Sequence, residues 1–335
     1  MPVGPLNLLT DVPGLLVGNA EDLAVRSGVT VVLAEQPCPA AVDVRGGGPG
    51  TAETDLLDPA ATVERIDAVV LSGGSAFGLE ARGGVVQALA EAGRGFAIAG
   101  LTVPIVPAAI LFDLANGGRK DWGDSPPYHA LGAAALRAAG RDFALGNTGA
   151  GLGIKAGRLK GGLGSASWRL ADGTTVAALV AANPRGSAVM PDGTFWAWAE
   201  ERDGEFGRPP PPASPAPDPD DEALWAAPVT GANTTLAVVA TDAALDKAGC
   251  RRLAIMAQTG LARAIRPLHT PLDGDVVFAL STERRPTPDP AGLARLGEAA
   301  ASCLARAVAR ALWHADTLGP YPSWRARYRG DGVRN

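Results

Sequence analysis

The residue of this chain with the clearest chemical potential is a threonine that directly precedes an apolar segment. Thr234 follows Asn233 and leads into the apolar run 236–240, while seven of the eleven residues 209–219 upstream are prolines. Such a proline-rich segment is extended and cannot join a sheet, so it predicts an exposed loop. A threonine placed there could attack its own preceding carbonyl, and the freed amine could then serve as its base. Most Asn-Thr pairs before a strand are ordinary turn chemistry, so the pattern alone does not establish a nucleophile.

Four further polar residues stand at the ends of expected strands. Asp273 and Asp275 are two residues apart, so they share one face of a strand, where paired carboxylates could hold an ammonium group and shift each other's pKa. Asn183 closes an apolar segment and could donate to an oxyanion. Lys160 stands before two glycines, which let backbone or ligand approach closely. Each residue also has an ordinary interpretation, as a turn former or as a solvated strand end.

Other familiar motifs are incomplete. The glycines of 149–153 do not form GxGxxG, and Ser75 lacks a GxSxG elbow because Phe77 stands where glycine is required. The cysteines and histidines are few and scattered, so we expect no metal, no cofactor and no disulfide framework. These residues are Cys38, Cys250, Cys303, His129, His269 and His314.

Composition excludes several classes of protein. The chain has 335 residues, of which 47% are hydrophobic and 19% charged, as expected of a globular protein. Its net charge is −5 and its basic residues form no stripe, so nucleic acid is not an expected partner. It has no apolar run of membrane-spanning length and no basic region followed by an apolar stretch at its start. We therefore expect no membrane association, no signal peptide and a cytoplasmic location.

Hydrophobic periodicity predicts the elements that must position these residues. Strands are expected at 29–33, 40–44, 66–71, 96–98, 101–106, 161–167, 174–182, 194–200, 235–241 and 275–281. Helices are expected at 79–92, 128–139, 243–265 and 290–316. Asp242 is the expected N-cap of the third helix. Strands cluster and helices follow them, which favours two sheets with helices outside over strict β-α-β alternation.

Seven separated motifs, in order and spacing over nearly the whole chain, resemble the P1 (S58) peptidase family. Its members include L-aminopeptidase/D-esterases, β-peptidyl aminopeptidases and nylon-oligomer hydrolases. The motifs are DVRGGGPG (43–50), LSGGSAFGLE (71–80), GAG (149–151), KGGLG (160–164), NP (183–184), NTT (233–235) and HTPLDGD (269–275).

The resemblance implies a fold and a processing event. The fold would be of the α+β class, a four-layer αββα sandwich of the type of N-terminal-nucleophile hydrolases and ornithine acetyltransferase. One domain over 1–335 would cleave itself into a large fragment, 1–233, and a small fragment, 234–335. The exposed proline-rich loop, about 203–230, would lie just before the cut.

The resemblance also assigns roles by matching position. Thr234 matches the nucleophile, and Asn233 lies on the leaving side of the cut. Asn183 matches the asparagine that stabilises the oxyanion. Asp273 and Asp275 match the acidic pair that orients the threonine amine.

The catalytic cation is assigned less uniquely. Matching the KGG motif selects Lys160, which we adopt. Matching the GAG motif instead brings the cation nearer Arg158, and Lys155 is a further alternative.

Within the family, Asn before Thr and a downstream Asp-Gly-Asp place the chain nearer the nylon-hydrolase branch. We therefore expect a self-processing amide hydrolase for peptides or ω-amino-acid oligomers such as 6-aminohexanoate oligomers. The alternative is an aminopeptidase/D-esterase or β-peptidyl aminopeptidase, and an ornithine-acetyltransferase-type acyltransferase is a third reading. The expected partners are a small amide or peptide substrate and further copies of the chain, as a tetramer of α/β units.

Overall fold

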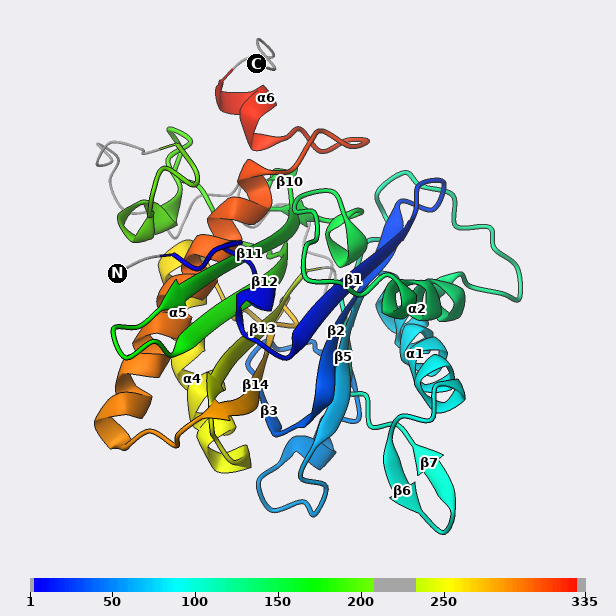
Figure 1. Ribbon diagram of the computed structural model, residues 1–335. Helices are drawn as coiled ribbons and strands as arrows, with labels where there is room; N and C mark the ends of the chain where they lie inside the picture. The colour runs from blue at the N-terminus through cyan, green and yellow to red at the C-terminus, as the bar shows by residue number, and fades with distance from the viewer. Residues whose placement is uncertain (1–2, 208–232, 330–335) are drawn as a thin grey trace.

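A computed structural model describes residues 3–207 and 233–329 of the chain. Two five-stranded sheets face each other, and helices cover the outer face of each (Figure 1). The expected four-layer αββα arrangement is therefore confirmed. The proline-rich loop, expected at about 203–230, lies outside the described residues from position 208 onward.

The first sheet has the strand order β1-β2-β5-β8-β4. Neighbouring strands in this sheet are antiparallel, except that β5 and β8 run parallel to each other. Its strands are β1 (Leu15–Asp22), β2 (Ser27–Cys38), β4 (Gly50–Ala52), β5 (Ile66–Ser72) and β8 (Ala108–Ile110).

The second sheet has the strand order β11-β12-β13-β14-β3 and contains the Asn233–Thr234 junction at its centre. Here β13 and β14 are parallel, and the other neighbours are antiparallel. Its strands are β3 (Ala40–Val44), β11 (Gly162–Arg169), β12 (Thr175–Asn183), β13 (Thr234–Ala243) and β14 (Val276–Arg285).

Helices α1 (Glu80–Glu91) and α2 (Tyr128–Arg137) cover the first sheet, whereas α4 (Lys247–Ala264) and α5 (Pro290–Trp313) cover the second. A short helix α6 (Trp324–Tyr328) follows α5. Two small hairpins stand apart from the sheets: β6 (Phe96–Ile98) with β7 (Leu101–Val103), and β9 (Lys155–Ala156) with β10 (Leu159–Lys160). The 3-10 helices are η1 (Leu9–Asp11), η2 (Asp55–Leu57), η3 (Ser75–Leu79), η4 (Gly149–Gly151) and η5 (Trp196–Glu200).

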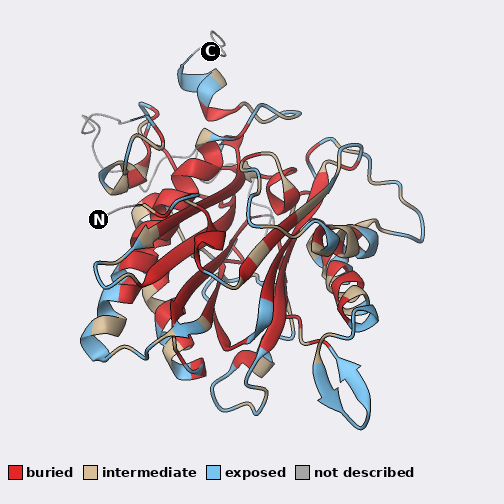
Figure 2. Ribbon diagram, in the orientation of Figure 1, coloured by how far each residue is buried: buried red, intermediate tan, exposed pale blue. Residues whose placement is uncertain are grey.

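Three apolar clusters separate the four layers, and burial is concentrated in the two sheets and their inner helix faces (Figure 2). Alternate residues of one strand enter different clusters, as the period of two requires. In β12, Val180 packs in the cluster that contains residues of α4 and α5, whereas Leu179 packs between the sheets. Because both faces are buried, the central strands read as continuous apolar runs.

One expected strand is wrong, and one expected helix begins later than predicted. The segment 194–200, which alternates like a strand, forms the 3-10 helix η5. Phe195 at its start stacks on Trp324 with ring centroids 5.0 Å apart, so aromatic packing takes the place of strand pairing.

The third helix begins later than expected, at Lys247, with Asp246 as its N-cap. Asp246 accepts the backbone N–H of Gly249 at 2.7 Å. Asp242 instead belongs to β13, where its carboxylate accepts the backbone N–H of Thr175 at 2.8 Å. Sheet hydrogen bonding thus extends the strand over the expected first turn.

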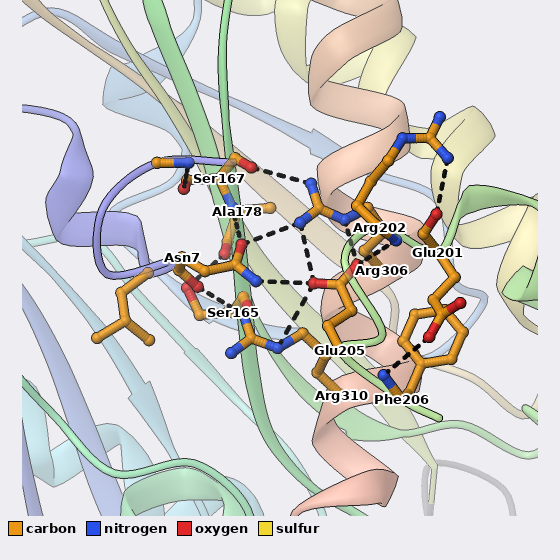
Figure 3. Close-up of polar contacts among 12 residues, drawn as sticks. Asn7, Ser165, Ser167, Ala178, Glu201, Arg202, Glu205, Phe206, Arg306 and Arg310 are labelled. Carbon is orange, nitrogen blue, oxygen red and sulfur yellow. Dashed lines mark hydrogen bonds and ion pairs between the residues drawn. The ribbon is translucent and has the colours of Figure 1, made fainter. Parts of the chain in front are cut away.

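A buried ionic cluster, which we call the Arg306 cluster, joins α5 to the N-terminal segment and to the loop after η5 (Figure 3). It consists of Asn7, Glu205, Arg306 and Arg310. Glu205 accepts Arg306 Nε at 2.5 Å and Nη2 at 2.9 Å, and Asn7 Nδ2 donates to Glu205 at 2.7 Å. The side chain of Arg306 is fully buried. Each charge in this cluster therefore meets an opposite charge or a neutral acceptor.

Among residues 3–207 and 233–329, no helix combines the length and the apolar character that crossing a membrane requires.

Candidate active site

Thr234 is the first residue of β13, and its hydroxyl lies against the peptide bond that precedes it. In the sheet register it pairs with Asn183, the last residue of β12. Leu236 shares a strand face with Thr234, and Leu179 shares one with Asn183. Both leucines pack between the two sheets, so the side chains of Thr234 and Asn183 also turn toward that space. Thr234 is 2% exposed, and its Oγ1 donates to the carbonyl oxygen of Asn233 at 2.6 Å. The nucleophile proposed from sequence is thus buried beside the bond it would attack.

The side-chain amide of Asn183 is held at both ends. Its Oδ1 accepts the backbone N–H of Lys155 at 3.1 Å, and its Nδ2 donates to the carbonyl oxygen of Phe112 at 3.2 Å. Cross-strand neighbours have Cβ atoms roughly 5 Å apart, which brings this amide within reach of a carbonyl attacked by Thr234. Its location suits a donor to an oxyanion.

Asp273 lies in the loop before β14 and accepts three hydrogen bonds. Its Oδ1 accepts the backbone N–H of Arg185 at 2.9 Å. Its Oδ2 accepts the backbone N–H of Thr270 at 3.1 Å and the hydroxyl of Thr270 at 2.6 Å. Burial, and then the neighbouring carboxylate of Asp275, raise the pKa of Asp273 above its ordinary value.

Asp275 connects the nucleophile strand to a histidine. Its Oδ1 accepts the backbone N–H of Thr235 at 2.7 Å, directly after Thr234. Its Oδ2 lies 2.9 Å from Nδ1 of His269 and accepts the backbone N–H of the same residue at 3.2 Å. Asp275 is fully buried. The carboxylate therefore fixes the start of β13 while His269 fixes the carboxylate.

His269 has no role predicted from the sequence, although it is the first residue of the motif HTPLDGD. Its backbone is left-handed, with φ of 55°, a conformation that is uncommon for residues other than glycine. The usable signal was the turn-forming context His-Thr-Pro six residues before Asp275.

The three candidate cations differ in their surroundings. Lys160 is fully buried, and its ammonium donates to the carbonyl oxygens of Gly151 at 2.8 Å and Gly161 at 2.7 Å. Burial lowers its pKa to about 7, opposed in part by Asp113. Lys155 is half-buried and touches Asn183 through its backbone, and Arg158 is exposed. A cation that titrates near neutral pH at a buried position is the strongest candidate of the three.

Lys160 is linked to the site through the backbone. The residue after it, Gly161, lies so close to the end of β12 that an added Cβ would stand 2.2 Å from the carbonyl oxygen of Ala182. Ala182 is in turn the neighbour of Asn183. The lysine and the asparagine therefore belong to adjoining segments.

The glycine motif after β3 supports the aspartate loop from the other side. Gly48 donates its backbone N–H to the carbonyl oxygen of Asp273 at 2.8 Å, and Arg45 donates to that of Asp275 at 3.0 Å. An added Cβ on Gly46 would stand 2.2 Å from the backbone nitrogen of Asp275. Glycine is needed there because the two loops touch through their backbones.

The described residues contain no group of three or more His, Cys, Asp or Glu side chains that could hold a metal ion. The cysteines are buried and unpaired. Burial raises the pKa of the thiols of Cys38 and Cys303 to about 12, which opposes thiolate formation.

Comparison with known proteins gives consistent results. A family model for peptidase family S58 matches residues 7–322. A Mycobacterium tuberculosis protein named as an uncharacterised aminopeptidase is 45% identical over 97% of this chain and 99% of its own length. A 6-aminohexanoate-oligomer endohydrolase of Kocuria sp. is 31% identical over 87% of this chain and 79% of its own length.

Solved structures agree with the fold. A β-aminopeptidase of Burkholderia sp. superposes with a TM-score of 0.69 at 24% identity, covering 100% of this chain and 96% of that one. An L-aminopeptidase D-Ala-esterase/amidase of Ochrobactrum anthropi, described as a variant of the Ntn hydrolase fold, superposes with a TM-score of 0.67 at 23% identity, covering 96% and 90%. The fold is that of the N-terminal-nucleophile hydrolases.

Proposed function

The chain belongs to peptidase family S58 and is an amide hydrolase, and we propose that it is a self-processing aminopeptidase with an N-terminal threonine. The observation on which the proposal rests is the contact of Thr234 Oγ1 with the carbonyl oxygen of Asn233 at 2.6 Å, at the head of a buried strand beside Asn183. A hydroxyl in that position is adjacent to the one bond whose cleavage would make it N-terminal.

Self-cleavage would proceed by an acyl shift. Thr234 Oγ attacks the carbonyl carbon of Asn233, the bond from that carbon to the threonine nitrogen breaks, and the hydroxyl proton passes to the departing nitrogen. Water then hydrolyses the resulting ester, which leaves a carboxylate on Asn233 and a free Thr234 amine. The products are the large fragment 1–233 and the small fragment 234–335.

Turnover would use the amine that this step creates. An α-amine has a reference pKa of about 7.7–8.0, so near neutral pH it can take the proton of Oγ as Thr234 attacks a substrate amide. Asn183 would donate to the oxyanion, a contribution of roughly 3–4 kcal/mol at comparable sites. Asp273 and Asp275 would hold the amine, and Lys160 would supply a cation or a proton. Water then releases the acyl group.

We favour the aminopeptidase hypothesis over the hypothesis of nylon-oligomer hydrolysis that the sequence motifs suggested. The mycobacterial relatives that bear the aminopeptidase name are more similar to this chain, and over more of its length, than the oligomer hydrolases are.

Substrate preference can be tested through the substrate amine. An aminopeptidase should hydrolyse amino-acid p-nitroanilides and lose activity when their amine is acetylated. An enzyme that cleaves linear 6-aminohexanoate oligomers internally should tolerate a blocked amine. Equal rates on free and acetylated substrates would contradict the aminopeptidase assignment.

Self-processing can be tested on the purified chain by denaturing gel and intact mass. Cleavage should give fragments of about 24 and 10 kDa by residue fraction, the smaller one starting Thr-Thr-Leu-Ala. Thr234→Ala should leave one chain of 34.0 kDa with no turnover. A Thr234→Ala protein that is processed and active would end the proposal.

We also propose that the chain assembles with copies of itself, as a tetramer of α/β units. The hairpin β6–β7 supports an interface between copies, because it extends from the body of the molecule and is exposed along its length (Figure 2). Phe96 and Leu101 are 58% and 67% exposed, and residues 95–112 include no charged residue. Such apolar surface commonly marks an interface. Light scattering coupled to size exclusion should report a tetramer, and a monomeric mass would contradict this.

A further inference from the structure

We propose that the backbone N–H of Gly274 stabilises the oxyanion during self-cleavage, as a catalytic group distinct from Asn183. This inference rests on the self-processing proposed above. It assigns a role to a glycine that lies between the two candidate aspartates.

Hydrogen bonding in the uncleaved chain identifies the donor. The carbonyl oxygen of Asn233 accepts the N–H of Gly274 at 3.0 Å and the hydroxyl of Thr234 at 2.6 Å. The side-chain Nδ2 of Asn183 donates to the carbonyl oxygen of Phe112 instead. Two donors therefore contact the carbonyl at which self-cleavage would occur, and neither is the amide of Asn183.

Only one of these two donors can persist through the reaction. When Oγ of Thr234 bonds to the carbonyl carbon, its proton leaves for the departing nitrogen, so the hydroxyl no longer donates to the oxygen. The N–H of Gly274 keeps its proton and faces the oxygen as negative charge develops. Its distance of 3.0 Å falls within the range of about 2.7–3.1 Å expected for an oxyanion donor.

The peptide unit that provides this donor is fixed at both ends. Its carbonyl, that of Asp273, accepts the N–H of Gly48 at 2.8 Å. Hydrogen bonds in series polarise one another, so this contact strengthens the donor at the other end. The side chains of Asp273 and Asp275 anchor the loop before and after the unit. A donor held in advance needs no reorganisation when the charge appears.

The same position requires glycine. An added Cβ on residue 274 would stand 2.7 Å from Oγ1 of Thr234 and 2.7 Å from the carbonyl oxygen of Gly48. A side chain there would push the peptide away from the nucleophile or displace the nucleophile itself.

The test compares the self-cleavage rates of the full wild-type chain, Gly274→Ala and a control, followed by intact mass. The control is Gly292→Ala in α5, where an added Cβ would meet Pro288 at a similar 2.9 Å, outside the candidate site. Circular dichroism and thermal melts establish that each protein is folded. Gly274→Ala should cleave at least about ten-fold more slowly than wild type, since loss of one such donor costs about 10²–10³-fold. Gly292→Ala should cleave at the wild-type rate.

A folded Gly274→Ala protein that cleaves as fast as wild type would overturn the inference. If the wild-type chain does not cleave, the proposed function fails instead, so the two failures are distinguishable.

A second measurement avoids substitution of Gly274. In full-length Thr234→Ala, which stays uncleaved, the Gly274 amide should exchange its hydrogen at least about 10²-fold more slowly than an unprotected amide, because it remains bonded to the carbonyl of Asn233. NMR measures the exchange rate of this single amide separately from the others. Exchange at the unprotected rate would contradict the hydrogen bond and with it the inference.

Discussion

Two buried polar regions of this molecule, the Arg306 cluster and the surroundings of Thr234, differ in how their charges are paired. In the Arg306 cluster, opposite charges meet: Glu205 bonds Arg306 through two nitrogens, and Arg310 lies beside them. Around Thr234, like charges meet instead, since the carboxylates of Asp273 and Asp275 are neighbours and burial raises the pKa of Asp273.

The cations show the same contrast. The guanidinium of Arg306 is matched by a carboxylate, whereas the ammonium of Lys160 is bonded to two backbone carbonyls. A protein gains no stability from burying a lysine whose pKa falls to about 7. We infer that the Arg306 cluster serves the fold and that the Thr234 region is kept for chemistry.

The largest expected effect comes from removing the buried ammonium. Lys160→Met should reduce kcat by about 10²–10⁴-fold, the usual contribution of a positioned acid or base. Lys247→Met is the matched control, because Lys247 is also buried and donates to two carbonyls, those of Leu56 and Ala61, but at the start of α4. Wild-type kcat in Lys160→Met would remove this residue from the mechanism.

The pH dependence of the stability of Lys160→Met, relative to wild type, tests the same contrast between the two regions. The folded-state pKa of Lys160, about 7, is below the unfolded value of about 10.4. The unfolded chain therefore binds the proton more tightly between these values, and the contribution of Lys160 to stability rises with pH from about 7 to about 10. Urea denaturation of the wild type relative to Lys160→Met should show this rise, whereas a difference that is constant with pH would contradict it.

The next largest effect is a loss of folding stability with no change in kcat. Arg306→Met leaves Glu205 buried without its main partner and should lower the free energy of unfolding by about 3–5 kcal/mol. Arg284→Gln is the control, since Arg284 and Glu35 form an exposed pair whose loss should cost less than about 1 kcal/mol. Urea denaturation measures both. The kcat of folded Arg306→Met should equal that of wild type, and a parallel loss of kcat would erase the distinction between the two regions.

Sequence predicted the layers well because the central strands are buried on both faces. The runs 176–182 and 236–240 are apolar without interruption, as a covered sheet requires. The segment 194–200 was misread because its alternation of aromatic residues also suits a 3-10 turn that packs on α6.

The sequence offers candidate site residues where a side chain has intrinsic chemistry and none where a backbone group would act. Thr234, Asn183 and the aspartates are candidates by type and position, and their expected roles come from the family resemblance. The sheet register brings Thr234 beside Asn183. The backbone N–H of Gly274 cannot be recognised from the sequence, because every residue except proline has a backbone N–H. His269 was overlooked because its partner lies six residues away across a turn rather than at a strand spacing.

His269 provides the smallest expected effect and the finest test of how the Thr234 region is held. Its ring contacts Asp275 and is 22% exposed on the side-chain scale, so it positions a carboxylate and does not touch Thr234 in any described contact. His269→Ala should reduce kcat about ten-fold, equivalent to about 1.4 kcal/mol for one hydrogen bond to a charged group. His129→Ala, at an exposed residue of α2, is the control.

A conservative variant separates positioning from general disruption. Asparagine tolerates the left-handed backbone that His269 adopts, with φ of 55°, and offers an N–H to Asp275. His269→Asn should therefore keep kcat within about three-fold of wild type, while alanine loses both the donor and the backbone preference. If the asparagine variant were as impaired as the alanine variant, the imidazole itself would act in the reaction. If alanine had no effect, the backbone N–H groups of Thr235 and of residue 269 would hold Asp275 well enough without the ring, and the Thr234 region would need less support than its like charges suggest.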